Sequence, residues 1–139
     1  MTKDIQGEGL AWQVATWNQM ANLYASENAP RLEPVAERVI FHADLNEGEA
    51  VLGTGTGLVP QLASISVGLP GDIAVRGLSN ITFDEGGAEL IPTKDGAFDV
   101  MLASLNLMFV VDRAAAARKA ARVLHTGGRF VGQVWTRPV

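Results

Sequence analysis

The stretch from Glu49 to Leu62, EAVLGTGTGLVPQL, constrains the possible fold more than any other part of the sequence. A short apolar run at residues 50–52 meets three glycines at alternate positions, Gly53, Gly55 and Gly57, and the chain then becomes amphipathic. This order predicts a strand, a tight loop and a helix. Glycines at such a junction allow positive φ angles and close approach of a ligand, and the free N–H groups of the next helix favour an electron-rich group. The motif is therefore a nucleotide-binding loop or a plain strand-to-helix turn, and both interpretations stay open here.

The composition limits the class of protein. At 139 residues, of which 47% are hydrophobic, the chain has the size of a single domain over residues 1–139 and enough apolar surface for a core. The net charge of -4 argues against a nucleic-acid partner, which would require a basic surface. There is no cysteine, which removes disulfides, thiolate nucleophiles and most zinc sites, and we expect no metal site. With no charged-then-apolar leader and no run long enough to cross a bilayer, we expect a cytoplasmic protein with no membrane partner.

The N-terminal part predicts a loose terminus followed by a helix. Residues 1–9 are polar and contain two glycines, which indicates a loose terminus. Residues 10–25 place Trp17, Met20 and Tyr24 at helical spacing and predict an amphipathic helix. Its aromatic face packs on the core, the commoner case, or covers a pocket.

A second helix is expected to begin near Pro30 or Pro34, because proline is tolerated in the first turn of a helix. It should run to about Ala43, and residues 44–48 should separate it from the first strand.

Residues 58–84 predict a short helix that ends near residue 71 and two brief strands at 72–75 and 81–84. Only five residues separate the two strands, whereas parallel neighbours need a crossover of about a dozen or more. The two segments therefore pair antiparallel, or one lies outside the main sheet, or strands are exchanged between chains. We prefer displacement of residues 72–75 from the main sheet.

The C-terminal half predicts a strand, a helix and a last strand. Residues 97–104, AFDVMLAS, form a nearly continuous apolar run, as expected of a strand covered on both faces. Asp112 is a good N-cap for an alanine-rich helix over residues 113–124, which Gly127–Gly128 would terminate, and residues 129–135 predict the last strand. Strands that alternate with helices predict an α/β fold with a mostly parallel sheet.

Four segments in order resemble a known family: TWNQMANLY, GEAVLGTGTGLV, NITFDEGGAELIPTKDGAFDVMLAS and LMFVVDRAAAARKAARVLHTGGRFVGQVW. From Trp12 to Trp135 the chain is similar to the class I S-adenosylmethionine-dependent methyltransferases. Within them it resembles the small-molecule type that includes ubiquinone and menaquinone biosynthetic methyltransferases. Its most distinctive parts are DGAFDV at residues 95–100 and ARVLHTGGRF at residues 121–130.

The resemblance implies a three-layer Rossmann-like methyltransferase fold with a mostly parallel sheet, reduced by one crossover helix and the C-terminal elements. It implies a methyltransferase with S-adenosylmethionine as cofactor and a small molecule as methyl acceptor. The positions that match the family's cofactor-contacting residues are Gly53, Thr54, Gly55, Thr56, Gly57, Ala88, Ser104 and Leu105, with Trp17 and Tyr24 of the first helix. No residue stands out as a catalytic base, so the catalytic residue is unknown.

Three acidic residues of the family pattern are missing. Leu52 runs directly into Gly53, where an acid would close the first strand, and residues 75–81 lack the acid and the helix that should follow the second strand. Gly87 stands where an acid near the adenine amino group is expected. We therefore expect binding of S-adenosylmethionine to be weak or absent. The alternative function is a non-catalytic relative or interaction module without cofactor, whereas a nicotinamide enzyme is disfavoured because GTGTG lacks the G-x-G-x-x-G spacing.

The remaining ionisable candidates favour structural roles. His42 and His125 lie at the ends of expected helices, where a surface or dipole role is commoner than catalysis. Asp99 is expected to support the start of its strand. Glu85 and Glu89 are the carboxylates nearest the adenine region, where they partly replace the missing acid or stay solvated.

The expected last strand would form an unprotected sheet edge, because family members commonly continue beyond the strand equivalent to residues 129–135. Natural proteins usually cover or pair such an edge. We therefore expect a homo-oligomer formed through this edge, with a two-fold dimer as the simplest form.

Overall fold

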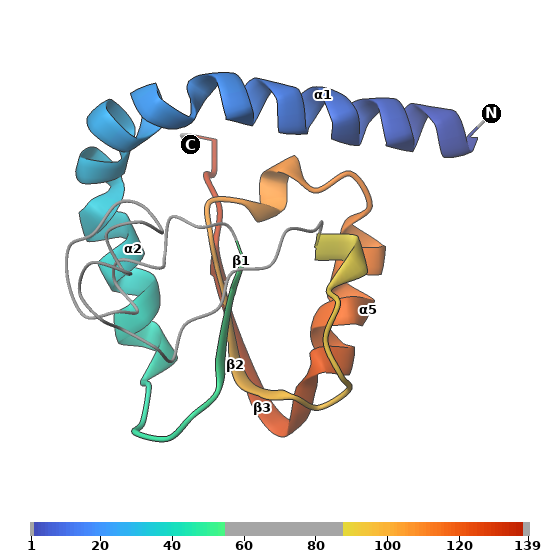
Figure 1. Cartoon of the computed structure of the whole chain (residues 1–139). Coiled ribbons are helices and arrows are strands. Elements are labelled where there is room, and N and C mark those ends of the chain that lie inside the picture. The colour runs from blue at the N-terminus through green and yellow to red at the C-terminus, as the bar shows by residue number, and fades with distance from the viewer. Residues whose placement is uncertain (1, 55–87, 138–139) are drawn as a thin grey trace.

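The computed structural model of the protein describes residues 2–54 and 88–137. Within them, three parallel strands form one sheet in the order β1 (Val51–Thr54), β2 (Phe98–Ser104) and β3 (Leu124–Gln133). The helix α2 (Ala29–Ala43) covers one face of the sheet and α5 (Arg113–Val123) covers the other (Figure 1). The predicted three-layer α/β architecture with a parallel sheet is confirmed.

The central strand β2 contributes to the core on both faces of the sheet. Val100 and Leu102 pack against Ala36, Val39 and Ala43 of α2. On the opposite face, Met101 packs against Ala120 and Val123 of α5. Successive side chains of a strand point to opposite faces, so a strand buried on both faces needs apolar residues at every position. This requirement explains the continuous apolar run of the sequence.

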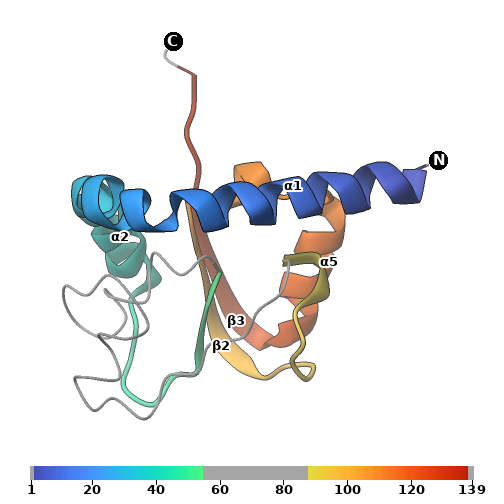
Figure 2. The same ribbon diagram turned by 45° about the horizontal axis from the view of Figure 1, so that its top comes forward.

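The first helix is longer than the sequence indicated. Helix α1 runs over Thr2–Leu23, so residues 2–9 are helical and the expected loose terminus is wrong. A helix extends readily once it has formed, and the chain has no proline before Pro30 to stop it. The two glycines that suggested disorder cost only about 1 kcal/mol each relative to alanine in a helix. Figure 2 shows α1 lying across the end of the sheet, with its N-terminal part extending past α5.

A π-helical turn, η1 (Tyr24–Asn28), joins α1 to α2. Helix α2 begins at Ala29 with Pro30 in its first turn, as predicted. It ends at Ala43, and the following Asp44 has a left-handed backbone with φ 48°. Asp44 therefore turns the chain away from the helix axis and into the loop that leads to β1.

The end of α5 differs from the expectation. The Asp112 side chain accepts a hydrogen bond from the backbone N–H of Ala115 at 2.8 Å, which confirms the predicted N-cap. The helix ends at Val123, however, and the glycines at 127–128 do not terminate it but lie inside β3. The register between β3 and β2 shifts at this point. Phe98 pairs with Leu124 and Val100 pairs with residue 129, so β3 has extra residues between these two pairs, which form a bulge.

The glycine motif begins inside the sheet. Gly53 and Thr54, expected in the loop, belong to β1 and pair with Leu102 and Ala103 of β2. The remaining motif residues, Gly55, Thr56 and Gly57, lie outside the described residues. So do the helix predicted within 58–71, the strands predicted at 72–75 and 81–84, the displacement of the first of these strands, and Glu85.

Two short 3-10 helices complete the described chain, η3 (Ala88–Leu90) before β2 and η4 (Leu107–Phe109) after it. Over residues 2–54 and 88–137, no helix combines the length and the apolar character needed to cross a bilayer. In the same residues no cluster of three or more histidine and carboxylate side chains could hold a metal ion.

Candidate functional site

Polar residues end all three strands at the same edge of the sheet. β1 ends at Thr54, β2 ends at Ser104 and β3 ends at Gln133. Because the strands are parallel, their carboxyl ends meet at one edge, and open α/β sheets bind ligands in the crevice outside that edge. The carboxyl edge is therefore the candidate site.

Gln133 connects two strands and a helix at this edge. Its Nε2 donates hydrogen bonds to Ser104 Oγ at 2.8 Å and to the carbonyl oxygen of Val35 in α2 at 2.6 Å. Its own carbonyl oxygen accepts from the backbone N–H of Leu105 at 3.0 Å. Leu105 has a left-handed backbone with φ 53°, a conformation that costs a branched residue free energy and marks functional turns. These hydrogen bonds fix the end of β2 and the turn after it, where the candidates Ser104 and Leu105 lie.

Thr54 is fixed from two sides. Its hydroxyl oxygen lies 3.1 Å from the carbonyl oxygen of Leu102 and accepts a hydrogen bond from Asn106 Nδ2 at 2.9 Å. Asn106 was missed from the sequence, although a polar residue inside the apolar run SLNLMFVV, directly after a strand, is a usable signal. The hydrogen bond joins residues 52 positions apart, the end of β1 and the turn after β2.

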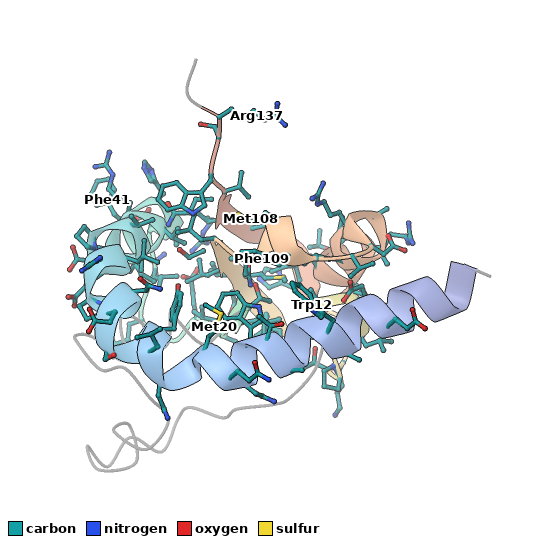
Figure 3. All side chains as sticks on the ribbon, turned by 90° about the horizontal axis from the view of Figure 1, so that it is seen from above. Trp12, Met20, Phe41, Met108, Phe109 and Arg137 are labelled. Atoms are coloured by element: carbon teal, nitrogen blue, oxygen red, sulfur yellow. The ribbon has the colours of Figure 1, made fainter. Side chains whose placement is uncertain are left out.

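An aromatic group lies between α1 and the turn after β2. The ring of Trp17 makes edge-to-face contacts with Tyr24 and with Phe109 of η4, each with ring centroids 5.5 Å apart. Figure 3, viewed down onto α1, shows Met20 and Trp12 on the flank of the helix where Met108 and Phe109 lie. The structure therefore brings the candidates Trp17 and Tyr24 over the carboxyl edge, together with Phe109, which the sequence did not single out.

Ala88 lies apart from the hydrogen-bonded residues. It opens η3, which packs against α5, and its neighbour Glu89 accepts a hydrogen bond from the backbone N–H of Asp112 at 3.3 Å. Asp112 caps the start of α5, which places Ala88 near the same end of the sheet but on the α5 side. Glu89 thus stabilises the start of α5 in this structure.

Ion pairs lie at the opposite, amino edge of the sheet. Asp99 accepts from the backbone N–H of Ala50 at 2.7 Å and pairs with His125 Nε2 at 2.6 Å, so the predicted structural role of Asp99 is confirmed. Arg129 donates to Glu49 at 2.8 Å, and this hydrogen bond lowers the pKa of Glu49 to about 2. His42 lies exposed in the last turn of α2. Neither histidine therefore lies at the candidate site.

Comparison with known proteins identifies the family. The profile described as Methyltransferase domain matches residues 51–132, more than half of the chain, from the start of β1 almost to the end of β3. The chain belongs to this methyltransferase family. Its resemblance to class I S-adenosylmethionine-dependent methyltransferases of the ubiquinone and menaquinone type is therefore confirmed.

Two curated relatives define the extent of the match. This chain is 36% identical over 110 residues to the demethylmenaquinone methyltransferase of Mycolicibacterium vanbaalenii, covering 77% of this chain and 45% of the relative. It is 40% identical over 63 residues to the ubiquinone/menaquinone biosynthesis C-methyltransferase UbiE of Caulobacter vibrioides, covering 45% of this chain and 25% of the relative. The chain thus spans less than half the length of these two relatives.

A solved structure has the same fold. The crystal structure of the cyclase SpnF superposes with a TM-score of 0.61 at 25% identity, covering 70% of this chain and 43% of that chain. The Rossmann-like methyltransferase fold predicted from the sequence is thereby confirmed.

Proposed function

We propose that this protein binds S-adenosylmethionine with low affinity at the carboxyl edge and transfers its methyl group to a small molecule. The observation that carries the proposal is the family match over residues 51–132, which begins and ends with strands that supply Thr54 and Gln133 to this edge. The curated relatives, whose names specify methylation of quinone precursors, support a small-molecule acceptor.

The residues present fit an adenosyl donor in position and in chemistry. The main chain at Gly53 and Thr54 forms the carboxyl end of β1. Ser104 ends β2, Leu105 begins the turn after it, and Ala88 lies on the α5 side. One buried acceptor at this edge, Asn106 Oδ1, has no hydrogen-bond partner among the described residues. Such an atom fits a ligand that carries N–H or O–H groups, as S-adenosylmethionine does.

The chemistry requires little from the protein beyond placement. When bound, S-adenosylmethionine would supply a methyl group on a sulfonium sulfur, and the neutral thioether that remains after transfer is a good leaving group. The protein's task is to hold the acceptor in line with that methyl group, which is a large part of catalysis by proximity. The aromatic group of Trp17, Tyr24 and Phe109 would exclude water above the edge.

Low affinity follows from the three missing acidic residues. A hydrogen bond to a charged acceptor contributes about 1.5–3 kcal/mol, and about 1.4 kcal/mol corresponds to a tenfold change in affinity. Losing two or three such contacts therefore weakens binding by roughly a hundredfold or more when nothing replaces them.

A second candidate function is a non-catalytic methyltransferase-like module without cofactor. The absence of acidic residues at Leu52–Gly53, across residues 75–81 and at Gly87 favours it. The structural neighbour SpnF has this fold and is named as a cyclase, so the fold supports more than one kind of chemistry.

The deciding experiment is a thermal shift and isothermal titration series with S-adenosylmethionine, S-adenosylhomocysteine and NAD. A ligand that binds only the folded state raises the melting temperature. We expect stabilisation by both S-adenosyl compounds at millimolar concentration and none by NAD. Low-micromolar affinity would contradict the weak-binding part of the proposal, and no shift by either S-adenosyl compound at millimolar concentration would favour the non-catalytic module.

We also propose that the protein is cytoplasmic, binds neither nucleic acid nor membrane, and self-associates through the β3 edge. In the described residues β3 has only β2 as a strand neighbour, and Phe130, Val134 and Trp135 on or just after it are exposed. A two-fold axis would let two copies pair the same unprotected edge. Sedimentation should give a dimer that Val134→Lys dissociates and that Phe41→Lys, at an exposed apolar residue of α2, leaves intact. A monomeric wild-type protein at high concentration would refute the self-association.

A further inference from the structure

The hydrogen bonds around Thr54 determine the orientation of the Asn106 side-chain amide. Thr54 Oγ1 lies 3.1 Å from the carbonyl oxygen of Leu102, which only accepts, so the single hydroxyl hydrogen of Thr54 is used there. Thr54 Oγ1 can then only accept a hydrogen bond from the side-chain amide of Asn106, which lies 2.9 Å away. The amide atom that faces Thr54 is therefore Asn106 Nδ2, because the amide oxygen cannot donate. Asn106 Oδ1 consequently faces away from Thr54 and remains available as an acceptor.

Asn106 Oδ1 is buried and has no partner among the described residues. Two other side-chain atoms share this property, Thr93 Oγ1 and Arg122 Nε. They lie near the amino edge, where the other nitrogens of Arg122 already bind Thr93, Asp95 and Ile91. Asn106 Oδ1 is thus the only such atom of the described residues at the carboxyl edge. A buried acceptor without a partner is costly, and its retention at a ligand-binding edge indicates a partner that arrives with the ligand.

The backbone before Asn106 is also specialised. Leu105 has φ 53°, and its N–H donates to the carbonyl oxygen of Gln133 at 3.0 Å. This left-handed turn reverses the chain directly after β2 and brings Asn106 to the end of β1. A strained residue held by the carboxyl end of a third strand is typical of a functional turn rather than of a simple connection.

We propose that Asn106 is a specificity-determining residue of the carboxyl edge, whose Oδ1 accepts a hydrogen bond from an N–H or O–H group of the bound ligand. This inference rests on the proposed function and deepens it. An acceptor selects amine, ammonium and hydroxyl groups and disfavours carboxylate or phosphate oxygens at the same position. An S-adenosyl compound carries such donors on its adenosine part and on its amino-acid part.

The test compares the affinities of variants for two ligands by isothermal titration. Asn106→Leu removes both polar atoms at similar size, and Asn106→Ala removes them with a smaller side chain. Asn46→Leu is the matched control, because Asn46 lies before β1 and its Nδ2 likewise donates to a carbonyl oxygen, that of Asp44 at 3.1 Å. The ligands are S-adenosylhomocysteine and 5′-methylthioadenosine, which lacks the amino-acid part.

We expect Asn106→Leu to weaken the binding of S-adenosylhomocysteine about tenfold, which corresponds to the loss of about one hydrogen bond. Its melting temperature without ligand should stay close to that of the wild type, because the variant removes the partnerless acceptor together with the hydrogen bond to Thr54, and these two effects oppose each other. Asn106→Ala should weaken binding to a similar extent, and Asn46→Leu should stay within about threefold of wild-type affinity, within the accuracy of additive site effects. If Asn106→Leu lowers the affinity for S-adenosylhomocysteine alone, the ligand's donor group lies on its amino-acid part. If the affinity for 5′-methylthioadenosine falls equally, the donor group lies on the adenosine part.

Three results would overturn the inference. Unchanged affinity in Asn106→Leu would do so while leaving the proposed function intact. Equal weakening by Asn46→Leu and Asn106→Leu would show that the loss is not specific to the carboxyl edge. If the wild type binds neither ligand at millimolar concentration, the proposed function fails and the inference fails with it. Should Asn106→Leu not fold, Asn106→Ala decides, because unchanged affinity there excludes an accepting role.

Discussion

Arg129 Nη2 lies 2.8 Å from Glu49 Oε2, and this ion pair joins β3 to the loop that leads into β1. The same guanidinium group donates to the carbonyl oxygens of Ala43 and Asp44 at the end of α2, at 3.2 and 3.3 Å. The hydrogen bond from Arg129, supported by one from the backbone N–H of Asn46, lowers the pKa of Glu49 from 4.5 to about 2. The ionised form of the Glu49 side chain is therefore more strongly stabilised in the folded protein than in the unfolded chain.

The lowered pKa predicts a loss of stability in acid. Because the folded pKa lies below the unfolded value, the stabilisation is complete above pH 4.5 and is lost as the pH falls towards 2. Glu49→Gln should lower the melting temperature at pH 7 and make it depend less on pH in that acid range. Circular dichroism melts from pH 7 to pH 2.5 measure both effects.

Glu47→Gln is the control for this prediction. Glu47 is exposed in the same loop, and within residues 2–54 and 88–137 the structure gives it no hydrogen bond or ion pair. It should melt like the wild type at every pH. If Glu49→Gln and Glu47→Gln have the same acid profile, the ion pair with Arg129 contributes no stability.

Two substitutions of Asp99 should differ in their effect on the free energy of unfolding. Its carboxylate accepts from Ala50 N–H and pairs with His125, so it connects all three strands at their amino ends. Asp99→Ala should lower the free energy of unfolding by about 1–3 kcal/mol, because both partners lose their acceptor. Asp99→Asn should cost less, since its oxygen still serves Ala50 and its amide donates to a neutral tautomer of His125. Urea unfolding distinguishes them, and an equal cost for both variants would contradict this account.

The sequence predicts those parts of the fold that depend on local patterns. The apolar run of β2, the prolines at the start of α2 and the capping Asp112 each identify an element from its own residues. Their parallel order then follows from the alternation of strands and helices. For the same reason the family is recognisable from the amino-acid sequence alone.

The rest depends on contacts between distant segments. The hydrogen bond of Asn106 to Thr54 spans 52 residues, so no local pattern predicts it. The glycines at 127–128 look like a helix stop, yet the pairing of β3 with β2 extends the strand through them. Tertiary pairing overrides the local signal there, as it does for Gly53 and Thr54 in β1.

Gly128 predicts a strong effect of a single methyl group. A Cβ atom at this position would lie 2.9 Å from the carbonyl oxygen of His125 and 3.1 Å from that of Asp99. Both neighbours are backbone atoms that cannot rotate away. Gly128→Ala should therefore destabilise the protein by about 1–3 kcal/mol, the usual cost of overpacking. Gly7→Ala is the control, because Gly7 is helical with nothing within 4 Å of its Cβ position, and alanine there should not destabilise the protein. Equal melting temperatures for the two variants would contradict the prediction.

Trp17 predicts how firmly α1 is attached over the carboxyl edge. Its ring contacts Tyr24 and Phe109, and edge-to-face pairs of this kind contribute about 0.5–1.5 kcal/mol each. Trp17→Ala should therefore increase the population of detached α1, and with it the rate of limited proteolysis within α1, by several-fold to about tenfold. Trp12→Ala removes the same kind of side chain from the same helix, but Trp12 is 69% exposed, so its cleavage rate should stay at the wild-type value. If both variants are cleaved at the same rate, the contact between Trp17 and Phe109 does not hold α1 in place, and the aromatic group cannot shield the site as proposed.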